Sequence, residues 1–120
     1  MRDFANKTAF ITGGASGVGL GIAKALAKAQ ANVVIADIQP ERLSDAEQQL
    51  RAITPNILAL AVDTTDIESL QRALTEIEAT VGPVSVLCNN AGIGGGGKIL
   101  ETADDKWRRV TEVNLWGPLN

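Results

Sequence analysis

The 120-residue sequence contains no histidine and no tyrosine, and it has a single cysteine. Without histidine, this stretch can form neither a histidine-centred catalytic triad nor a histidine metal site, and without tyrosine it has no phenol for acid–base chemistry. Cys88 cannot form an internal disulfide, and its apolar surroundings indicate a small core residue. Such cysteine usage is typical of a reducing compartment, so we expect a cytoplasmic protein, and we expect no metal site.

Long apolar runs and an excess of basic residues are also missing. No apolar run approaches the roughly 20 residues that a membrane helix needs, and residues 1–7 lack the apolar core of a secretion signal. Lys and Arg together number 11 against 14 for Asp and Glu, a net charge of −3. The composition therefore predicts neither a nucleic-acid nor a membrane partner, and the length predicts one domain at most, residues 1–120.

Four short runs rich in Val and Ile are predicted to be strands. They cover residues 8–12, 33–37, 57–63 and 84–89. Near-continuous apolar runs are typical of parallel strands that are buried on both faces. Because helical patterns separate these runs, the sequence predicts βαβ units with right-handed crossovers, and therefore an α/β fold.

Three of the intervening segments carry one apolar stripe at helical spacing. The first covers residues 18–29, and Pro40 suits the first position of the second. The third is expected to begin at a capping box of Thr65 and Glu68 and to stop at Gly82. These stripes are most simply the faces that pack on the sheet.

A fourth helix is expected to begin near Thr102. Trp107, Val110 and Asn114 fall on one face of it by their spacing, so we expect the Asn114 amide to point inward. A buried amide needs hydrogen-bond partners. Asn114 is therefore either a satisfied structural residue or part of a functional site.

A glycine-rich stretch, Thr-Gly-Gly-Ala-Ser-Gly-Val-Gly, runs from Thr12 to Gly19 directly after the first predicted strand. Glycines allow a sharp turn and close approach to a ligand, and the unpaired N–H groups at the start of the following helix suit a pyrophosphate. The spacing differs from the G-x-G-x-x-G fingerprint, so a flexible strand–helix connection is the alternative. The candidate phosphate contacts are Gly13, Ser16, Gly17, Val18 and Gly19.

Polar residues end each predicted strand: Thr12, Asp37, Asp63 and the pair Asn89–Asn90. The carboxyl ends of parallel strands lie along one edge of the sheet, where ligands bind. Any one of these residues could instead be an N-cap or turn residue. Together with the glycine loop, they predict a nucleotide site.

Asp37 lies eighteen residues after Gly19, near the distance at which an acidic residue meets the ribose of a dinucleotide. Its charge would repel a 2′-phosphate and favour NAD over NADP by roughly tenfold or more. Ile38 is expected beside it. Alternatively, Asp37 only caps the next helix. The positive charge of Arg42 could reduce this preference for NAD, although the simpler interpretation is that Arg42 occupies a solvated position on the helix.

Two further groups complete the predicted site. Asp63 and Thr64 would border the adenine, unless they only start the next helix. Asn90, Ala91 and Gly92 place an amide and two small residues where a flat ring or a sugar could approach closely.

These motifs together resemble the short-chain dehydrogenase/reductase family. Residues 12–19 match its TGxxxGxG loop, Asp37 and Asp63 match its acidic residues after the second and third strands, residues 89–92 match its NNAG motif, and residues 113–117 match the segment around its catalytic asparagine, here Asn114. The resemblance implies a Rossmann-like, doubly wound parallel sheet of strand order 3-2-1-4. It also implies NAD(P)-dependent hydride transfer between the nicotinamide and a small-molecule alcohol or carbonyl substrate, in a homodimer or homotetramer. With the charge of Asp37, we expect the cofactor to be NAD rather than NADP.

One departure from the family pattern concerns acid–base chemistry. The catalytic serine and the Tyr-xxx-Lys pair of the family lie beyond Asn114, and residues 1–120 contain no tyrosine. We therefore expect the amino-terminal half of such an enzyme, truncated after the fourth helix and inactive alone. The alternative is a non-catalytic dinucleotide-binding module or subunit.

Overall fold

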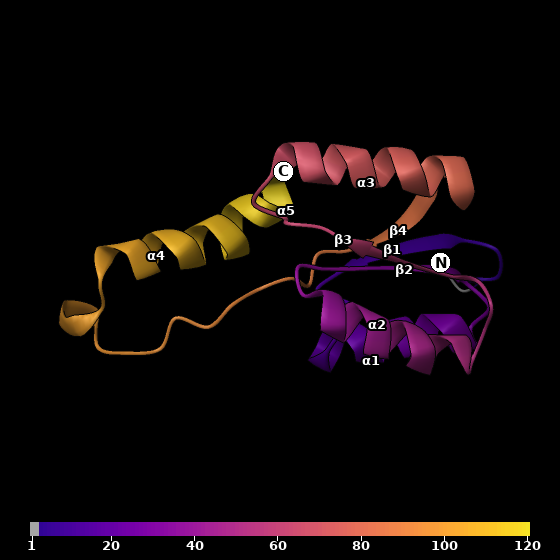
Figure 1. The fold of residues 1–120 in the computed structure, drawn as a ribbon, viewed down its shortest axis with the longest axis horizontal. Coiled ribbons are helices and arrows are strands. Elements are labelled where there is room, and N and C mark those ends of the chain that lie inside the picture. Colours follow the sequence, from indigo (N-terminus) through magenta and orange to yellow (C-terminus); the bar gives the residue numbers. More distant parts are fainter. Residues whose placement is uncertain (1–2) are drawn as a thin grey trace.

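The computed structural model describes residues 3–120 as a four-stranded parallel sheet with helices on both faces (Figure 1). The strand order is β3-β2-β1-β4, so the predicted fold class and strand order are confirmed. The strands are β1 (Thr8–Thr12), β2 (Asn32–Asp37), β3 (Ile57–Ala61) and β4 (Val84–Cys88).

Two helices, α1 (Gly17–Lys28) and α2 (Pro40–Arg51), cover one face of the sheet, and α3 (Ile67–Thr80) covers the other (Figure 1). After β4 the chain passes through a short 3₁₀ turn, η1 (Ile99–Glu101), into α4 (Asp104–Thr111), which projects away from the sheet (Figure 1). Within residues 3–120, no helix combines the length and the apolar composition needed to cross a membrane.

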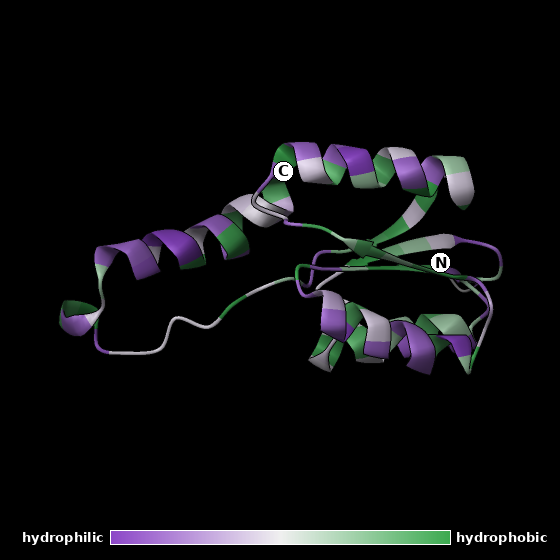
Figure 2. Cartoon of the chain, viewed as in Figure 1, coloured by the Kyte–Doolittle hydropathy of each residue, from purple (hydrophilic) through white to green (hydrophobic). Residues whose placement is uncertain are grey.

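Alternate residues of the central strands supply the two cores. Ile11 and Ile35 belong to the cluster under α1 and α2, whereas Phe10 and Val34 belong to the cluster under α3. All five residues of β1 are buried, as expected for a strand enclosed on both faces. Figure 2 shows the strands as largely hydrophobic and the helices as mixed, because each helix has one face toward the sheet.

Two strands end earlier than predicted, and hydrogen bonds explain both differences. The N–H of Asp63 donates to the Ser69 hydroxyl at 3.2 Å, so the chain has left the sheet by Asp63, and β3 ends at Ala61. Beyond β4, the N–H of Asn90 donates to a side chain of β1, not to a neighbouring strand. At the carboxyl edge of the sheet, side-chain hydroxyls thus accept the backbone N–H groups that no neighbouring strand accepts.

The helix starts are partly as predicted. Pro40 is the first residue of α2, as expected. The predicted capping box is wrong, because Asp66 is the N-cap of α3 and accepts the N–H of Glu68 at 3.0 Å. The Thr65 hydroxyl is engaged elsewhere, donating to Asp63 at 2.7 Å.

The predicted fourth helix is interrupted. After α4 comes a π-helical turn, η2 (Glu112–Trp116), and then the short α5 (Gly117–Leu119). Pro118 has no N–H, and a proline ring inside a helix clashes with the carbonyl four residues earlier. The turn before it is widened, so that the N–H of Gly117 donates to the carbonyl of Glu112, five residues back.

This last segment returns to the sheet at the β3–α3 turn. Gly117 is buried there, and a Cβ on it would lie 3.0 Å from the Thr64 hydroxyl oxygen. The Asn120 side chain donates to the Thr64 carbonyl at 3.0 Å. Close packing at Thr64 therefore holds the end of the chain.

Replacing Ile35 with alanine tests the core between the sheet and α1–α2. Ile35 is fully buried, so Ile35→Ala should lower the free energy of unfolding by about 2–5 kcal/mol, measured by denaturant unfolding of the full-length protein. As a control, Ile99→Ala removes the same atoms from a side chain that is 75% exposed, and it should change stability by less than about 0.5 kcal/mol. Equal losses in both variants would contradict the assigned core.

Candidate functional site

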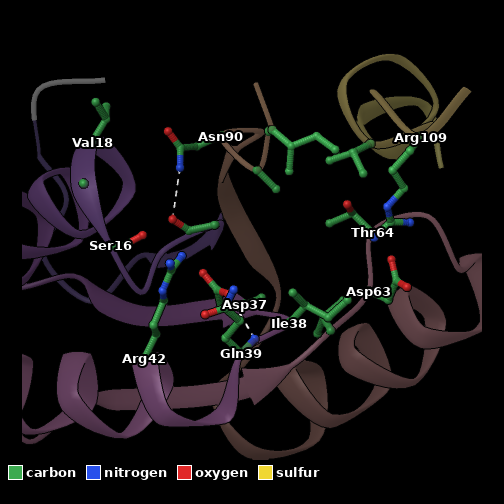
Figure 3. Close-up of a pocket in the computed structure, with 18 residues that line it drawn as sticks. Ser16, Val18, Asp37, Ile38, Gln39, Arg42, Asp63, Thr64, Asn90 and Arg109 are labelled. Atoms are coloured by element: carbon green, nitrogen blue, oxygen red, sulfur yellow. Dashed lines mark hydrogen bonds between the residues drawn. The ribbon is translucent and has the colours of Figure 1, made fainter. Parts of the chain in front are cut away.

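A cavity of about 340 Å³ lies at the carboxyl edge of the sheet. Its walls come from the glycine loop, the end of β2, the turn after β3 and the loop after β4 (Figure 3). Most of the predicted site residues therefore share one cavity although they are far apart in the sequence. They are Gly13, Ser16, Gly17, Val18, Asp37, Ile38, Asp63, Thr64, Asn90, Ala91 and Gly92.

The glycine loop needs its glycines for different reasons. Gly13 and Gly17 have φ of 63° and 53°, in the left-handed region. A Cβ on Gly13 would lie 2.9 Å from the Cα of Ala91, whereas one on Gly17 would meet nothing within 4 Å. Gly19 does not line the cavity, and a Cβ there would overlap the Gly13 carbonyl and the Asn90 side chain. The lack of a side chain at Gly19 thus lets α1 pack closely against Gly13 and Asn90, whereas the lack of one at Gly17 leaves open space in front of the glycine loop.

The amino terminus of α1 faces this open space. Ser16 is the N-cap residue, but its hydroxyl makes no cap hydrogen bond, and it lines the cavity. The first N–H groups of a helix lack intrahelical partners and carry partial positive charge. A free hydroxyl and a helix amino terminus in one place can bind a phosphate group.

Thr12 and Asn90 join the ends of β1 and β4. The Thr12 hydroxyl oxygen accepts the N–H groups of Asn90 and Ala91, both at 3.1 Å, and donates to the Cys88 carbonyl at 3.4 Å. The Asn90 amide donates to the carbonyls of Thr12 and Gly13, both at 3.1 Å. The two hydrogen bonds donated by this amide hold the glycine loop against the end of β4.

Asp37 is half-buried at the end of β2 and points into the cavity (Figure 3). One carboxylate oxygen accepts the N–H of Gln39 at 3.1 Å, which stabilises the turn into α2. Within residues 3–120, the other oxygen has no hydrogen-bond partner. The side chain therefore supports the helix start and also presents a carboxylate oxygen to the cavity.

Asp63 is the second carboxylate of the cavity. The Thr65 hydroxyl, donating at 2.7 Å, lowers the pKa of Asp63; partial burial opposes this, while the Thr65 N–H at 2.9 Å and the charge of Arg109 lower it further. The carboxylate is thus held in its ionised form. Throughout the described part of the chain, no three His, Cys, Asp or Glu side chains converge in a group that could hold a metal ion.

Two arginines contribute to the cavity walls, Arg42 from α2 and Arg109 from α4 (Figure 3). Arg42 is exposed, in agreement with the solvated helix position, and it also lines the cavity because the first turn of α2 directly follows the end of β2. Arg109 could not be predicted, since no local pattern indicates how α4 is placed. The remaining lining residues are Ala36, Gln39, Val62, Ile93 and Val113.

Asn114 is exposed and does not line the cavity, so the expectation that its amide points into a core is wrong. Asn114 lies in η2, where Val113 is the buried residue, and the preceding α4 projects from the sheet and has no buried residue. The amide nevertheless has a partner on both its oxygen and its nitrogen, accepting the N–H of Ile93 at 2.8 Å and donating to the Ile93 carbonyl at 2.9 Å. Asn114 thereby fixes the loop that follows β4.

Comparisons with known proteins decide the family. The model of the short chain dehydrogenase family matches residues 7–120. The chain belongs to this family. A curated relative, the C alpha-dehydrogenase of Sphingobium sp. (strain NBRC 103272 / SYK-6), is 38% identical over 121 residues, which are 100% of this chain and 40% of the relative.

Solved structures of the family superpose closely. The apo form of LigO from Sphingobium sp. strain SYK-6 has a TM-score of 0.96 at 40% identity, covering 99% of this chain and 44% of that one. L-sorbose reductase from Gluconobacter frateurii, solved with NADPH and L-sorbose, has a TM-score of 0.88 at 33% identity, covering 98% of this chain and 45% of that one. The chain thus spans less than half the length of these relatives.

Replacing Thr12 with valine tests the joint between β1 and β4. Thr12→Val keeps the shape but leaves the N–H groups of Asn90 and Ala91 without their acceptor. We expect unfolding measurements to show a loss of about 1–3 kcal/mol or more. Thr75→Val, which removes an exposed hydroxyl on α3, should cost far less, and similar losses in both would contradict the role of Thr12.

Replacing Thr65 with valine tests the electrostatics of Asp63. The pKa of Asp63 is lowered in the folded state, so its ionised form contributes stability above the unfolded pKa of about 4, and this stability is lost as pH falls through the folded pKa. Without the Thr65 hydroxyl, the pKa should rise toward its ordinary value and this acid-sensitive stability should shrink. NMR titration of the Asp63 carboxyl measures the change; an unaltered titration would exclude the assigned cause.

Proposed function

We propose that the protein is an NAD-dependent oxidoreductase that transfers hydride between a nicotinamide and a small-molecule alcohol or carbonyl substrate. Residues 1–120 supply the dinucleotide site in this proposal. The observation that carries it is the presence, in one cavity, of a glycine loop at a helix amino terminus and a carboxylate with one oxygen unpartnered within residues 3–120. Membership of the short chain dehydrogenase family supports the same reaction class.

The residues present fit an adenine dinucleotide from one end of the cavity to the other. The Ser16 hydroxyl, which makes no cap hydrogen bond, and the start of α1 would hold the pyrophosphate, and Asp37 would accept hydrogen bonds from the adenosine ribose. Ile38, which is 53% exposed, offers an apolar surface for the adenine, and Asp63 with Thr64 borders the same end.

The loop after β4 would meet the nicotinamide half. Ala91 and Gly92 lack bulky side chains and line the cavity, so a ring or a sugar could approach their backbone. When bound, the nicotinamide supplies or accepts the hydride. Asn114 stays our candidate catalytic residue, and in this chain it positions the Ile93 backbone beside that loop.

NAD is the proposed cofactor because of the charge of Asp37. A 2′-phosphate close to this carboxylate would be repelled. L-sorbose reductase was solved with NADPH, so membership of the family does not by itself select NAD, and the proposed preference rests on the residues of this cavity. The single-domain organisation, the cytoplasmic location and the dimeric or tetrameric state stay predictions of the sequence.

Titration of the full-length protein with NAD and NADP tests this proposal. We expect NAD to bind more tightly by roughly tenfold or more, and Asp37→Ala to narrow that difference. Asp45→Ala, an exposed carboxylate of α2 outside the cavity, should leave the ratio unchanged. A protein that binds neither dinucleotide would overturn the function, and an unchanged ratio in Asp37→Ala would exclude Asp37 as the ribose ligand.

A further inference from the structure

A second cavity, of about 620 Å³, lies at the amino edge of the sheet, where β1, β2 and β3 begin (Figure 1). The cavity proposed for the dinucleotide lies at the other edge, and the two cavities share no lining residue. The ends of α1 and α2 and the turns into the three strands form the walls of this second cavity, which we call the amino-edge cavity. Its volume lies within the range of about 300–1,000 Å³ that is typical of small-molecule sites.

A carboxamide side chain stands shortly before each of these three strands. Asn6, Gln30 and Asn56 lie within two residues of the starts of β1, β2 and β3, and all three line the amino-edge cavity. The turns are tied together through the backbone, because the N–H of Asn6 donates to the Gln30 carbonyl at 3.0 Å. Within residues 3–120, none of the three side-chain amides has a hydrogen-bond partner. Three groups that can both donate and accept therefore border one space on a fixed backbone.

Gln30 occupies a position where the backbone favours glycine. It follows the end of α1 with φ of 66°, in the left-handed region, and its N–H donates to the Ala27 carbonyl at 3.0 Å. The N–H of Ala31 donates to the Leu26 carbonyl at 3.1 Å, which completes a Schellman cap. Glycine is the usual residue there because it adopts this conformation without steric cost. Helix capping therefore does not explain a glutamine, whose side chain instead adds an amide to the cavity.

Lys28 gives the amino-edge cavity a positive charge. Within residues 3–120, Lys28 has no carboxylate within 4 Å, and no Asp, Glu or Arg lines this cavity. The carbonyls at the end of α1 already accept backbone N–H groups, so Lys28 does not serve as their cap. A lone ammonium matches the single charge of a carboxylate, whereas phosphate is bound best by the paired donors of arginine.

The other lining residues add an apolar surface. Ala27 is buried and Ile53 is half-buried at the ends of the two helices, so together they offer a small surface to C–H groups. Amide groups suit hydroxyls, because both partners can donate and accept. A molecule with several hydroxyls, one carboxylate and a C–H face satisfies all of these groups together.

We propose that the amino-edge cavity is a binding site for a small hydroxylated carboxylic acid. Lys28 pairs with the carboxylate, and the amides of Asn6, Gln30 and Asn56 bind the hydroxyls. The inference does not depend on the proposed dinucleotide function, because the two cavities have no residue in common.

NMR titration of the full-length protein with D-gluconate as the probe tests the site. The side-chain amide signals of Asn6, Gln30 and Asn56 should shift together and saturate in the millimolar range. D-Glucitol carries the hydroxyls without the carboxylate, so it should shift the same signals with about tenfold lower affinity. Acetate carries the charge without the hydroxyls, and it should also bind more weakly than gluconate.

Gln30→Gly removes one amide and keeps the backbone conformation. The unliganded variant should melt at a temperature no lower than that of the wild type, because glycine is favoured at this φ. Its affinity for gluconate should nevertheless fall about threefold to tenfold, the scale of one lost hydrogen bond. A role confined to the helix cap would not produce weaker binding in a variant with an undamaged fold.

Lys28→Gln tests the charge. It should weaken gluconate about tenfold and change the affinity for D-glucitol less than about twofold. The matched control is Lys7→Gln, because Lys7 is also exposed but does not line the cavity. This control should alter the affinity for gluconate less than about twofold.

Each outcome decides the inference independently of the dinucleotide titrations. Concerted shifts of the three amide signals, weakened by both Gln30→Gly and Lys28→Gln, support the site. If gluconate moves none of these signals at up to about 100 mM, or if both variants bind it as the wild type does, the site is overturned. If acetate binds as tightly as gluconate, the cavity does not recognise hydroxyls and the assigned ligand class is wrong.

Discussion

The hydroxyl of Thr12 is the contact on which the cavity depends. It serves three backbone groups of the chain that leaves β4, while the Asn90 amide returns two hydrogen bonds to the glycine loop. Strands β1 and β4 are neighbours in the sheet but are separated by more than seventy residues. Because buried polar groups need partners, this reciprocal set fixes the two loops against each other, and the shape of the cavity follows from their spacing.

The charges on the cavity walls differ in the partners that they have within the protein. Both carboxylates use one oxygen to hold a local turn, Asp37 at the start of α2 and Asp63 at the turn before α3. The two arginines have no such partner among the described residues. The two aspartates therefore stabilise the turns around the cavity, and together with the two arginines they place charges of both signs on its walls. Such a cavity suits a ligand that carries hydroxyls at one point and phosphates at another.

The sequence predicted the sheet and most of the cavity because both depend on local patterns. Apolar runs, helical stripes and polar strand ends are visible without coordinates, and the parallel topology then brings Asp37, Asp63 and Asn90 to one edge. The predictions that proved wrong concern contacts between distant segments, or neighbouring side chains that compete for the same hydrogen-bond partner. The spacing of Thr65 and Glu68 fits a capping box, yet the Thr65 hydroxyl donates to Asp63 and Asp66 is the N-cap. The helical spacing of Trp107, Val110 and Asn114 predicts an inward-facing amide, but the spacing carries no information on whether this helix packs on the sheet, and Asn114 is exposed.

The widened turn at η2 has a geometric consequence for both of its ends. One additional residue in a helical turn rotates everything after it by about 100° relative to a continuous α-helix. That change of phase places Gly117 on a different side of the helix from the one it would occupy after an unbroken α4, and in this structure Gly117 faces Thr64. A continuous α-helix through the same residues would turn Gly117 away from Thr64, so the contact between the last helical segment and the β3–α3 turn depends on this one irregular turn.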